Sequence, residues 1–225
     1  MFNPEIIFFD WNKTLSYSRF WEQLENKSHP HYKDGQKIFQ FLFKDNRSLL
    51  RPWMQGKLST GYILEQIKAG TGLSKDFLQE ELVKSCENMK FAFSGLDKLI
   101  QNLRKNGIKC VIATDNMDTF RKYTIPGMKL HEIFDDFLIS CELGVLKFDI
   151  DEEQSKLLFF DTFLSKENKN YNQVALVDDQ VDNGFYSSKG FQIFQISSPQ
   201  ELKNFLKKTG SSSPAPALVS ISPAK

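Results

Sequence analysis

The sequence predicts an α/β fold, a parallel sheet covered by helices on both faces and carrying an all-helical insertion. Short apolar runs recur along the chain, and several of them end in polar residues. Segments with apolar residues at helical spacing separate these runs, which is typical of parallel strands linked by helices. Between the first two apolar runs the periodicity is helical only, so this long stretch is predicted to be a helical insertion.

The first predicted strand is the apolar run 6–9, Ile-Ile-Phe-Phe. It is too short and too close to the N-terminus for a helix, and its lack of alternation indicates a strand buried on both faces. The run ends at Asp10. Open α/β sheets bind ligands beyond the carboxyl ends of their strands, so Asp10 lies where an active-site residue is expected. Taken alone, this aspartate equally fits a cap of the following turn or helix.

Residues 16–93 are predicted to form the helical insertion. Apolar residues recur at helical spacing near Phe20 and again over 38–43. Two further helices are expected to begin after Ser59 and Ser74, because a serine hydroxyl accepts hydrogen bonds from the first free amides of a helix. Pro30 separates the first two helical segments.

From Ser94 onward helices and strands alternate, which predicts a single sheet domain made of residues 1–15 and 94–209. The predicted strands are 108–113, 137–140, 174–177 and 191–196, and the predicted helices are 96–103, 155–164 and 199–208. Residues 210–225 are rich in serine, proline and alanine, and they are predicted to form a flexible tail or linker.

Polar residues follow three of the predicted strands and are expected to meet at one edge of the sheet: Asp10 with Asn12, Thr114 with Asp115, and Asp178 with Asp179 and Asp182. A lysine, Lys147, lies in a loop between the second and third of these groups. Carboxylates that converge with a lysine and a hydroxyl suit a hard divalent cation such as Mg²⁺ and the phosphate that it bridges. Each residue also has an ordinary interpretation as a cap, a turn residue or a solvated lysine.

The order and spacing of these residues resemble the haloacid dehalogenase (HAD) superfamily over about residues 5 to 200. The four motifs of that superfamily are matched by the segment through Asp10 and Thr14, by Thr114, by Lys147, and by Asp178 with Asp182. The resemblance implies a Rossmann-like core, and it identifies the helical insertion as a C1 cap. It also implies a Mg²⁺ cofactor.

The resemblance further implies a phosphatase that forms an aspartyl-phosphate on Asp10. Thr114 and Lys147 would bind the phosphate, with Asp115 beside them, and Lys147 would keep the nucleophile ionised. The implied metal ligands are Asp10, the backbone carbonyl of Asn12, and Asp178. Asp179 and Asp182 would orient these ligands.

One position departs from the pattern of HAD phosphatases. They usually carry a second aspartate two residues after the nucleophile, which protonates the leaving oxygen and later activates water, whereas this chain has Asn12 there. An amide cannot cycle a proton, and general acid–base catalysis contributes ~10²–10⁴-fold. Dehalogenases of the superfamily also lack this aspartate, but they need no metal, so the pair Asp178 and Asp179 argues against dehalogenation.

Several interpretations of Asn12 remain open. The protein is a slow phosphatase, or it acts on leaving groups that need little protonation, such as the phenol of protein phosphotyrosine. Alternatively, the asparagine was introduced to trap an otherwise active phosphatase. In a different class of function, the domain is catalytically weakened and serves as a phosphate-binding or recruitment module.

Composition restricts the partners. A formal charge of +1, from 29 basic and 28 acidic residues, gives no reason to expect nucleic acid. No apolar run approaches the ~20 residues of a membrane span, and the N-terminus does not resemble a secretion signal. Three cysteines without paired or metal-binding spacing indicate reduced thiols. We therefore expect a cytoplasmic monomer, with secretion into a host cytosol as the alternative, acting on a phosphorylated small molecule or a phosphoprotein.

The insertion also carries a group of basic and aromatic residues: Lys33, Lys37, Lys44, Arg47, Arg51 and Lys57, with Trp21, Tyr32 and Trp53. The favoured interpretation is a solvated basic face over an apolar helical core. The alternative is an entry for an acidic phosphopeptide or an aromatic phosphate.

Overall fold

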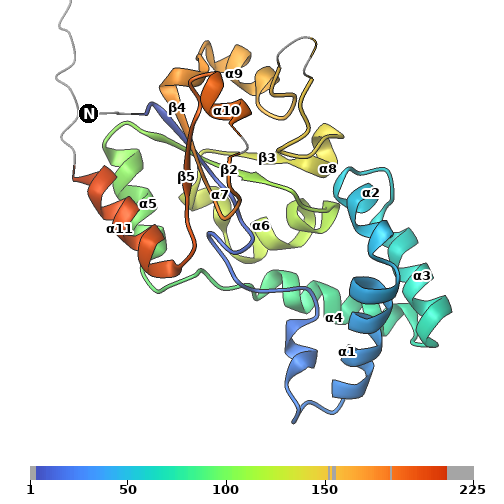
Figure 1. Cartoon of the computed structure of the whole chain (residues 1–225). Coiled ribbons are helices and arrows are strands. Elements are labelled where there is room, and N and C mark those ends of the chain that lie inside the picture. The colour runs from blue at the N-terminus through green and yellow to red at the C-terminus, as the bar shows by residue number, and fades with distance from the viewer. Residues whose placement is uncertain (1–3, 152, 154–155, 183, 212–225) are drawn as a thin grey trace, which may run out of the picture.

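The computed structural model describes residues 4–151, 153, 156–182 and 184–211. At its centre lies a five-stranded sheet in the order β3-β2-β1-β4-β5, with every neighbouring pair parallel (Figure 1). The strands are β1 (Ile6–Phe9), β2 (Lys109–Thr114), β3 (Asp136–Ile139), β4 (Val174–Asp178) and β5 (Gln192–Gln195). The α/β class and all five predicted strands are confirmed.

The first strand is the central one because it is apolar on both faces. Ile7 and Phe9 belong to one hydrophobic cluster, and Ile6 and Phe8 belong to another on the opposite face. Successive side chains of a strand point to opposite faces, so four consecutive apolar residues fill both layers. The ring of Phe8 packs edge-on against Phe160 with centroids 4.8 Å apart. Burial on both faces holds this strand at the centre of the sheet and so positions Asp10, which directly follows its last residue.

Helices cover both faces of the sheet. The helix α5 (Leu96–Lys105) lies beside α11 (Pro199–Gly210) on one side, as Figure 1 shows. The remaining helices of the sheet domain are α6 (Ile125–Gly127), α7 (Leu130–Ile133), α8 (Ser140–Leu143), α9 (Asp161–Glu167) and α10 (Phe185–Ser188). The domain also has a short π-helix, η4 (Phe120–Thr124), and a short 3₁₀-helix, η5 (Tyr171–Gln173). No helix among the described residues is long and apolar enough to cross a membrane.

Two predicted boundaries are corrected. The helix predicted over 155–164 begins only at Asp161, because Lys156 pairs its backbone with that of Asp151 and so does not join the helix. The last helix extends to Gly210, whose carbonyl accepts hydrogen bonds from the side chains of Asn102 and Asn106. Residues 212–225 of the predicted tail lie outside the described residues.

A helical cap lies between β1 and β2 and forms a separate group at one end of the molecule in Figure 1. Its elements are η1 (Glu22–Glu25), α1 (Tyr32–Phe39), η2 (Gln40–Asp45), η3 (Arg47–Leu49), α2 (Leu50–Met54), α3 (Thr60–Thr71) and α4 (Lys75–Glu87). The predicted serine caps are confirmed, since Ser59 and Ser74 accept hydrogen bonds from the amides of Tyr62 and Phe77.

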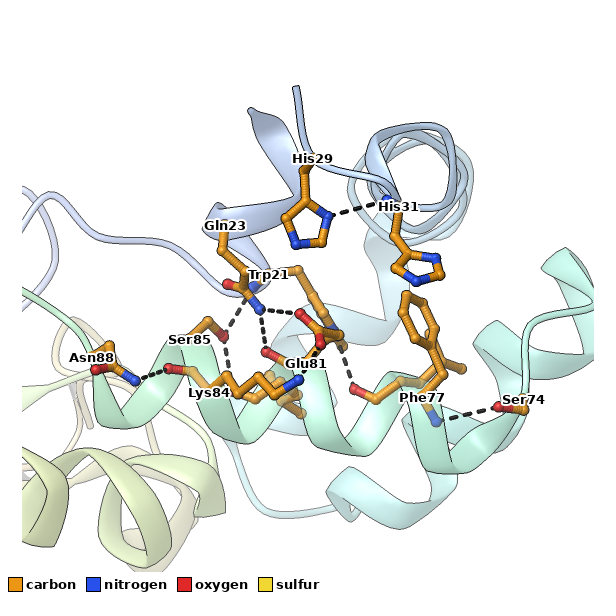
Figure 2. Close-up of polar contacts among 12 residues, drawn as sticks. Trp21, Gln23, His29, His31, Ser74, Phe77, Glu81, Lys84, Ser85 and Asn88 are labelled. Atoms are coloured by element: carbon orange, nitrogen blue, oxygen red, sulfur yellow. Dashed lines mark hydrogen bonds and ion pairs between the residues drawn. The ribbon is translucent and has the colours of Figure 1, made fainter. Parts of the chain in front are cut away.

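The two tryptophans of the basic and aromatic group belong to the interior of the cap. The indole of Trp21 donates to the carbonyl of Leu78, and the indole of Trp53 donates to the hydroxyl of Thr60. Figure 2 shows Trp21 beside the buried Glu81. Burial alone would raise the pKa of Glu81, but hydrogen bonds from Lys84 and Gln23 outweigh it and lower that pKa. These tryptophans therefore stabilise the cap and are not free to stack on a ligand.

Where the chain enters and leaves the cap, its two segments are hydrogen-bonded. The amide of Ala92 donates to the carbonyl of Leu15 at 2.8 Å, and the hydroxyl of Ser16 donates to the carbonyl of Lys90 at 2.7 Å. The hydrophobic cluster on this face of the sheet continues into the cap without a break. The division of the chain at residues 15/16 and 93/94 stays a prediction.

The far side of the cap is held to the sheet domain by polar contacts. Arg51 forms an ion pair with Asp149 at 2.6 Å, and the hydroxyl of Ser140 donates to the carbonyl of Met54 at 2.6 Å. Gly56 has a positive φ of 69°, and a Cβ at this position would lie only 2.2 Å from the carbonyl oxygen of Cys141. Glycine is therefore required for this close approach. The cap sits over the sheet edge with contacts on both sides.

Candidate active site

Three neighbouring strands bring the predicted polar residues together. Asp10 follows β1, Thr114 ends β2, and Asp178 ends β4. Since β1 lies between the other two strands and all three are parallel, their carboxyl ends meet at one edge of the sheet. Asp10 is 4% exposed, and Thr114 and Asp178 are 0% exposed.

A buried lysine joins two of these strand ends. Lys147 is 1% exposed, and its Nζ lies 2.5 Å from Oδ1 of Asp10 and 2.5 Å from Oδ2 of Asp178. The backbone of this lysine is also fixed, because its amide donates to Oδ1 of Asp115 at 2.9 Å and its carbonyl accepts from the hydroxyl of Tyr186. The loop after α8 is therefore held in place at the sheet edge.

The site keeps an excess of negative charge. Burial raises the pKa of Asp10, the positive charge of Lys147 opposes that rise, and the nearby Asp178 adds to it. Burial alone would lower the pKa of Lys147, but attraction to Asp10, Asp178 and Asp115 outweighs it and raises that pKa. A protonated lysine compensates only one of the carboxylates around it. A cation at this position would compensate the remaining charge.

The carboxylates have a geometry that fits a divalent cation. Asp10, Asp178 and the half-buried Asp179 each offer an oxygen, and these oxygens lie within 4.8 Å of one another. Oxygens on opposite sides of a Mg²⁺ ion are about 4 Å apart, because each lies about 2 Å from the ion. Among the described residues, this is the group of three acidic, histidine or cysteine side chains that lie close enough together to bind one metal ion, and we call it the acidic cluster. Buried carboxylates are the hard oxygen donors that Mg²⁺ prefers.

Four buried side-chain polar atoms among the described residues have no hydrogen-bond partner: Nε1 of Trp11 and Oγ1 of Thr14, Thr114 and Thr119. Of these, Thr114 ends the strand next to the one that Asp10 follows. A buried polar group left unsatisfied costs about 1–3 kcal/mol, so such groups usually serve a ligand or a bound water. Thr14 and Thr114 belong to the motifs singled out in the sequence, and the hydrogen bond expected from Thr114 to a phosphoryl oxygen stays a prediction.

Asn12 and Asp182 lie differently from the buried group. Asn12 is exposed in the turn that follows β1, next to Lys13, whose φ of 60° is left-handed. The carboxylate of Asp182 accepts from the amides of Gly184 and Ser187, both at 3.0 Å, and so caps the start of α10. The acidic cluster of Asp10, Asp178 and Asp179 does not include Asp182.

Sequence reasoning did not single out two residues that order this site. Tyr186 holds the Lys147 carbonyl, and Asp149 accepts from the amide of Leu146 at 3.0 Å while it pairs with Arg51 of the cap. The one sequence feature that could have pointed to Asp149 is its position two residues after Lys147. Nothing in the sequence around Tyr186 indicated its contact.

We expect Lys147→Met to lower the free energy of unfolding by about 3–5 kcal/mol, because it leaves Asp10 and Asp178 buried without their shared partner. Urea denaturation without added metal measures this loss. Lys13→Met is the control, since Lys13 is largely exposed and pairs with Asp179 only at 3.8 Å, where little stability is at stake. Equally small losses in both variants would contradict the structural role given to Lys147.

No protein-family model and no curated protein matches the sequence. Solved structures do match. A HAD family enzyme from Bacteroides thetaiotaomicron has a TM-score of 0.64 at 12% identity, covering 90% of this chain and 98% of that one. A predicted HAD-like family hydrolase from Porphyromonas gingivalis has a TM-score of 0.64 at 13% identity, covering 95% of this chain and 100% of that one.

Two further solved structures are similar to this chain. The Bacteroides enzyme has also been solved in complex with magnesium and inorganic phosphate, and that structure has a TM-score of 0.62 at 14% identity, covering 88% of this chain and 96% of that one. The L-2-haloacid dehalogenase from Xanthobacter autotrophicus has a TM-score of 0.60 at 15% identity, covering 95% of this chain and 85% of that one. The chain therefore has the fold of the haloacid dehalogenase superfamily, with a helical cap inserted after its first strand.

Proposed function

We propose that the protein is a Mg²⁺-dependent phosphatase of HAD type that hydrolyses a phosphomonoester through an aspartyl-phosphate on Asp10. The observation that carries this proposal is the buried Lys147 ammonium, 2.5 Å from the carboxylates of both Asp10 and Asp178. The unpaired hydroxyl of Thr114 lies on the neighbouring strand end. A nucleophile, a cation and a free donor at one sheet edge suit phosphoryl transfer, where catalysis is mostly positioning and charge stabilisation.

In this proposal an Oδ atom of Asp10 attacks phosphorus, the bond from phosphorus to the ester oxygen breaks, and the leaving alkoxide or phenoxide takes a proton from water. Lys147 neutralises charge on the transferring group and keeps Asp10 ionised, and Thr114 donates to a phosphoryl oxygen. Water then hydrolyses the acyl phosphate and regenerates Asp10. Lys147 stays protonated throughout, paired with Asp178 while Asp10 carries the phosphoryl group.

Asp10, Asp178 and the backbone carbonyl of Asn12 are the proposed ligands of Mg²⁺, with Asp179 beside them. When bound, this ion supplies compensation for the negative charge of the phosphate and of the carboxylates. The magnesium and phosphate complex of the similar Bacteroides enzyme supports the assignment. The acidic cluster also favours a phosphatase over a dehalogenase, although a dehalogenase shares the fold.

We propose an aryl phosphate as the preferred kind of substrate, because Asn12 cannot protonate a leaving group and a phenol needs little protonation. Phosphotyrosine in a protein is one biological example. The three free cysteines are consistent with a cytoplasmic location, and we propose that the enzyme is a monomer. The second candidate function, a phosphate-binding or recruitment module, is favoured only by Asn12, and it has no need for a nucleophile held by Lys147.

Removal of Mg²⁺ with a chelator is expected to abolish turnover of phenyl phosphate, and added Mg²⁺ is expected to restore it. Mg²⁺ alone should also raise the Tm, because an ion that binds only the folded state stabilises it. Asp178→Asn should lose this rise, since Asp178 belongs to the acidic cluster. Asp182→Asn is the matched control and should keep the rise, because its carboxylate binds the start of α10. Turnover that persists in chelator, or equal loss of the rise in both variants, would contradict the metal site.

A further inference from the structure

A cavity of about 560 Å³ lies between the cap and the carboxyl edge of the sheet. Its floor is made by the two loops that carry the site, with Trp11 and Asn12 directly after Asp10, and Asp115 and Asn116 directly after Thr114. A group bonded to a phosphate at Asp10 would therefore enter this cavity. The cavity is the space available to the leaving group.

The walls of this cavity are apolar and come mainly from the cap. They include Phe20, Phe39, Phe43, Leu50 and Met54. The rings are held by their neighbours, since Phe39 and Phe43 have centroids 5.6 Å apart and Phe20 lies 5.7 Å from the buried Trp53. Phe39 is nevertheless 42% exposed. Such a large apolar side chain at the edge of a cavity gains stabilisation when a ligand covers it.

The charged groups that line the cavity already have partners. Arg19 forms an ion pair with Glu25 at 2.5 Å, and both residues line the cavity. Lys13 lies 3.8 Å from Asp179, and Asp115 accepts from the amide of Lys147. Along its described lining the cations are thus Lys13 and Arg19, and each already lies within ion-pair distance of a carboxylate with which a second anionic group of a ligand would compete.

Three residues of the basic group singled out in the sequence, Lys37, Lys44 and Arg51, lie outside the cavity lining. Lys37 pairs with Asp34, Arg51 pairs with Asp149, and neither Lys37 nor Arg51 lines the cavity. Lys44 lies over the ring of Phe39 at 5.5 Å from its centroid, outside the lining. This placement disfavours the entry for an acidic phosphopeptide that was an alternative at the level of the sequence.

We propose that this cavity binds the leaving group of the substrate, and that this leaving group is an uncharged small-molecule phenol with an apolar body larger than one ring. The proposal rests on the proposed phosphatase function and names its substrate class. The size argument is that an apolar cavity of about 150 Å³ already holds benzene. A space of about 560 Å³ is therefore larger than a single phenol ring needs.

The test compares phenyl phosphate with 2-naphthyl phosphate, whose phenols have closely similar acidity, so that only the size of the apolar body changes. Dissociation constants are measured by calorimetry on Asp10→Asn protein, which does not turn the ligands over, and kcat/KM is measured on the unaltered protein. The second ring should tighten binding by about five- to tenfold, from the extra apolar area buried. A 4-carboxyphenyl ester should bind no better than the phenyl ester, because both cations of the lining, Lys13 and Arg19, already lie beside carboxylates.

The variant Phe39→Ser should remove most of the naphthyl preference and leave phenyl phosphate little affected. Tyr62→Ser is the matched control, because Tyr62 is 45% exposed on α3 of the cap and lies outside the cavity lining. Equal affinity for the two esters, or equal loss of the naphthyl preference in both variants, would overturn the inference about the cavity. Turnover of phenyl phosphate would still support the proposed phosphatase function in that case. Tighter binding of an acidic phosphotyrosine peptide than of the naphthyl ester would also overturn it. Absence of all turnover would instead overturn the proposed function, and the calorimetry would still decide the cavity.

Discussion

Replacing Asp10 with asparagine or alanine is expected to lower kcat by about 10⁴-fold or more, because the proposed covalent intermediate forms on this carboxylate. The fold should survive, since Asp10 follows the end of β1 and Lys147 keeps its second partner, Asp178, at 2.5 Å. Burial raises the pKa of Asp10, so its ionised form opposes folding above that pKa. The asparagine variant should therefore unfold at the same temperature as the original protein or at a higher one.

Initial rates with phenyl phosphate and thermal unfolding monitored by circular dichroism measure both effects. Asp118→Asn is the control, because Asp118 binds Lys122 and Thr60 where the cap meets the sheet domain and lies outside the acidic cluster. It should keep most of the activity. Activity retained after the loss of Asp10 would remove the covalent mechanism.

Asn12→Asp is expected to raise the rate on alkyl phosphates by about 10²–10⁴-fold, the usual contribution of a general acid or base. The gain on aryl phosphates should be much smaller, because a phenol has a pKa of about 10 and leaves with little need for a proton. Asn12 is exposed on the floor of the cavity, so a carboxylate is introduced there without burying a charge. The measurement is kcat/KM on an alkyl and an aryl ester in parallel, because kcat/KM reports departure of the leaving group and does not include the later hydrolysis of the acyl phosphate.

Asn116→Asp is the matched control for this gain. Asn116 also lies on the cavity floor, and its Oδ1 accepts from the amide of Met117, a contact that aspartate retains. Because Asn116 is only 7% exposed, thermal unfolding is measured beside the rates to show that the variant is folded. It adds a carboxylate on the other loop and should not raise the rate. Equal gains on both esters in Asn12→Asp protein would contradict the leaving-group explanation. No gain on either ester would favour the phosphate-binding module.

The sheet and part of the site were predictable because they depend on local pattern. Apolar runs such as 6–9 mark strands buried on both faces, and parallel strands place their carboxyl ends together. Asp10, Thr114 and Asp178 could therefore be placed at one edge from the sequence alone. The helix predicted from residue 155 was wrong at its start, because the pairing of Asp151 with Lys156 is a contact that helical periodicity does not encode.

The remaining features depend on contacts between distant segments. Lys147 reaches Asp10 across 137 positions of sequence, and only the folded loop brings the two together. The choice between Asp179 and Asp182 was open in the sequence, and it depends on how the turn after β4 directs each side chain. In the cap, the apolar pattern over 38–43 contains both the interior residue Leu42 and the cavity residue Phe39, so periodicity could not separate packing from binding.

The central claim is that Asp10 carries the phosphoryl group during turnover. Without an acid or base at position 12, hydrolysis of the acyl phosphate should be slow relative to departure of a phenol, so the intermediate should accumulate. The Mg²⁺-loaded protein is mixed with phenyl phosphate, quenched in acid, and examined by intact mass and peptide mapping. We predict the added mass of one phosphoryl group on the peptide that contains Asp10, and its absence in Asp10→Asn protein. Steady release of phenol and phosphate with no phosphoryl group on that peptide at any time would contradict the account.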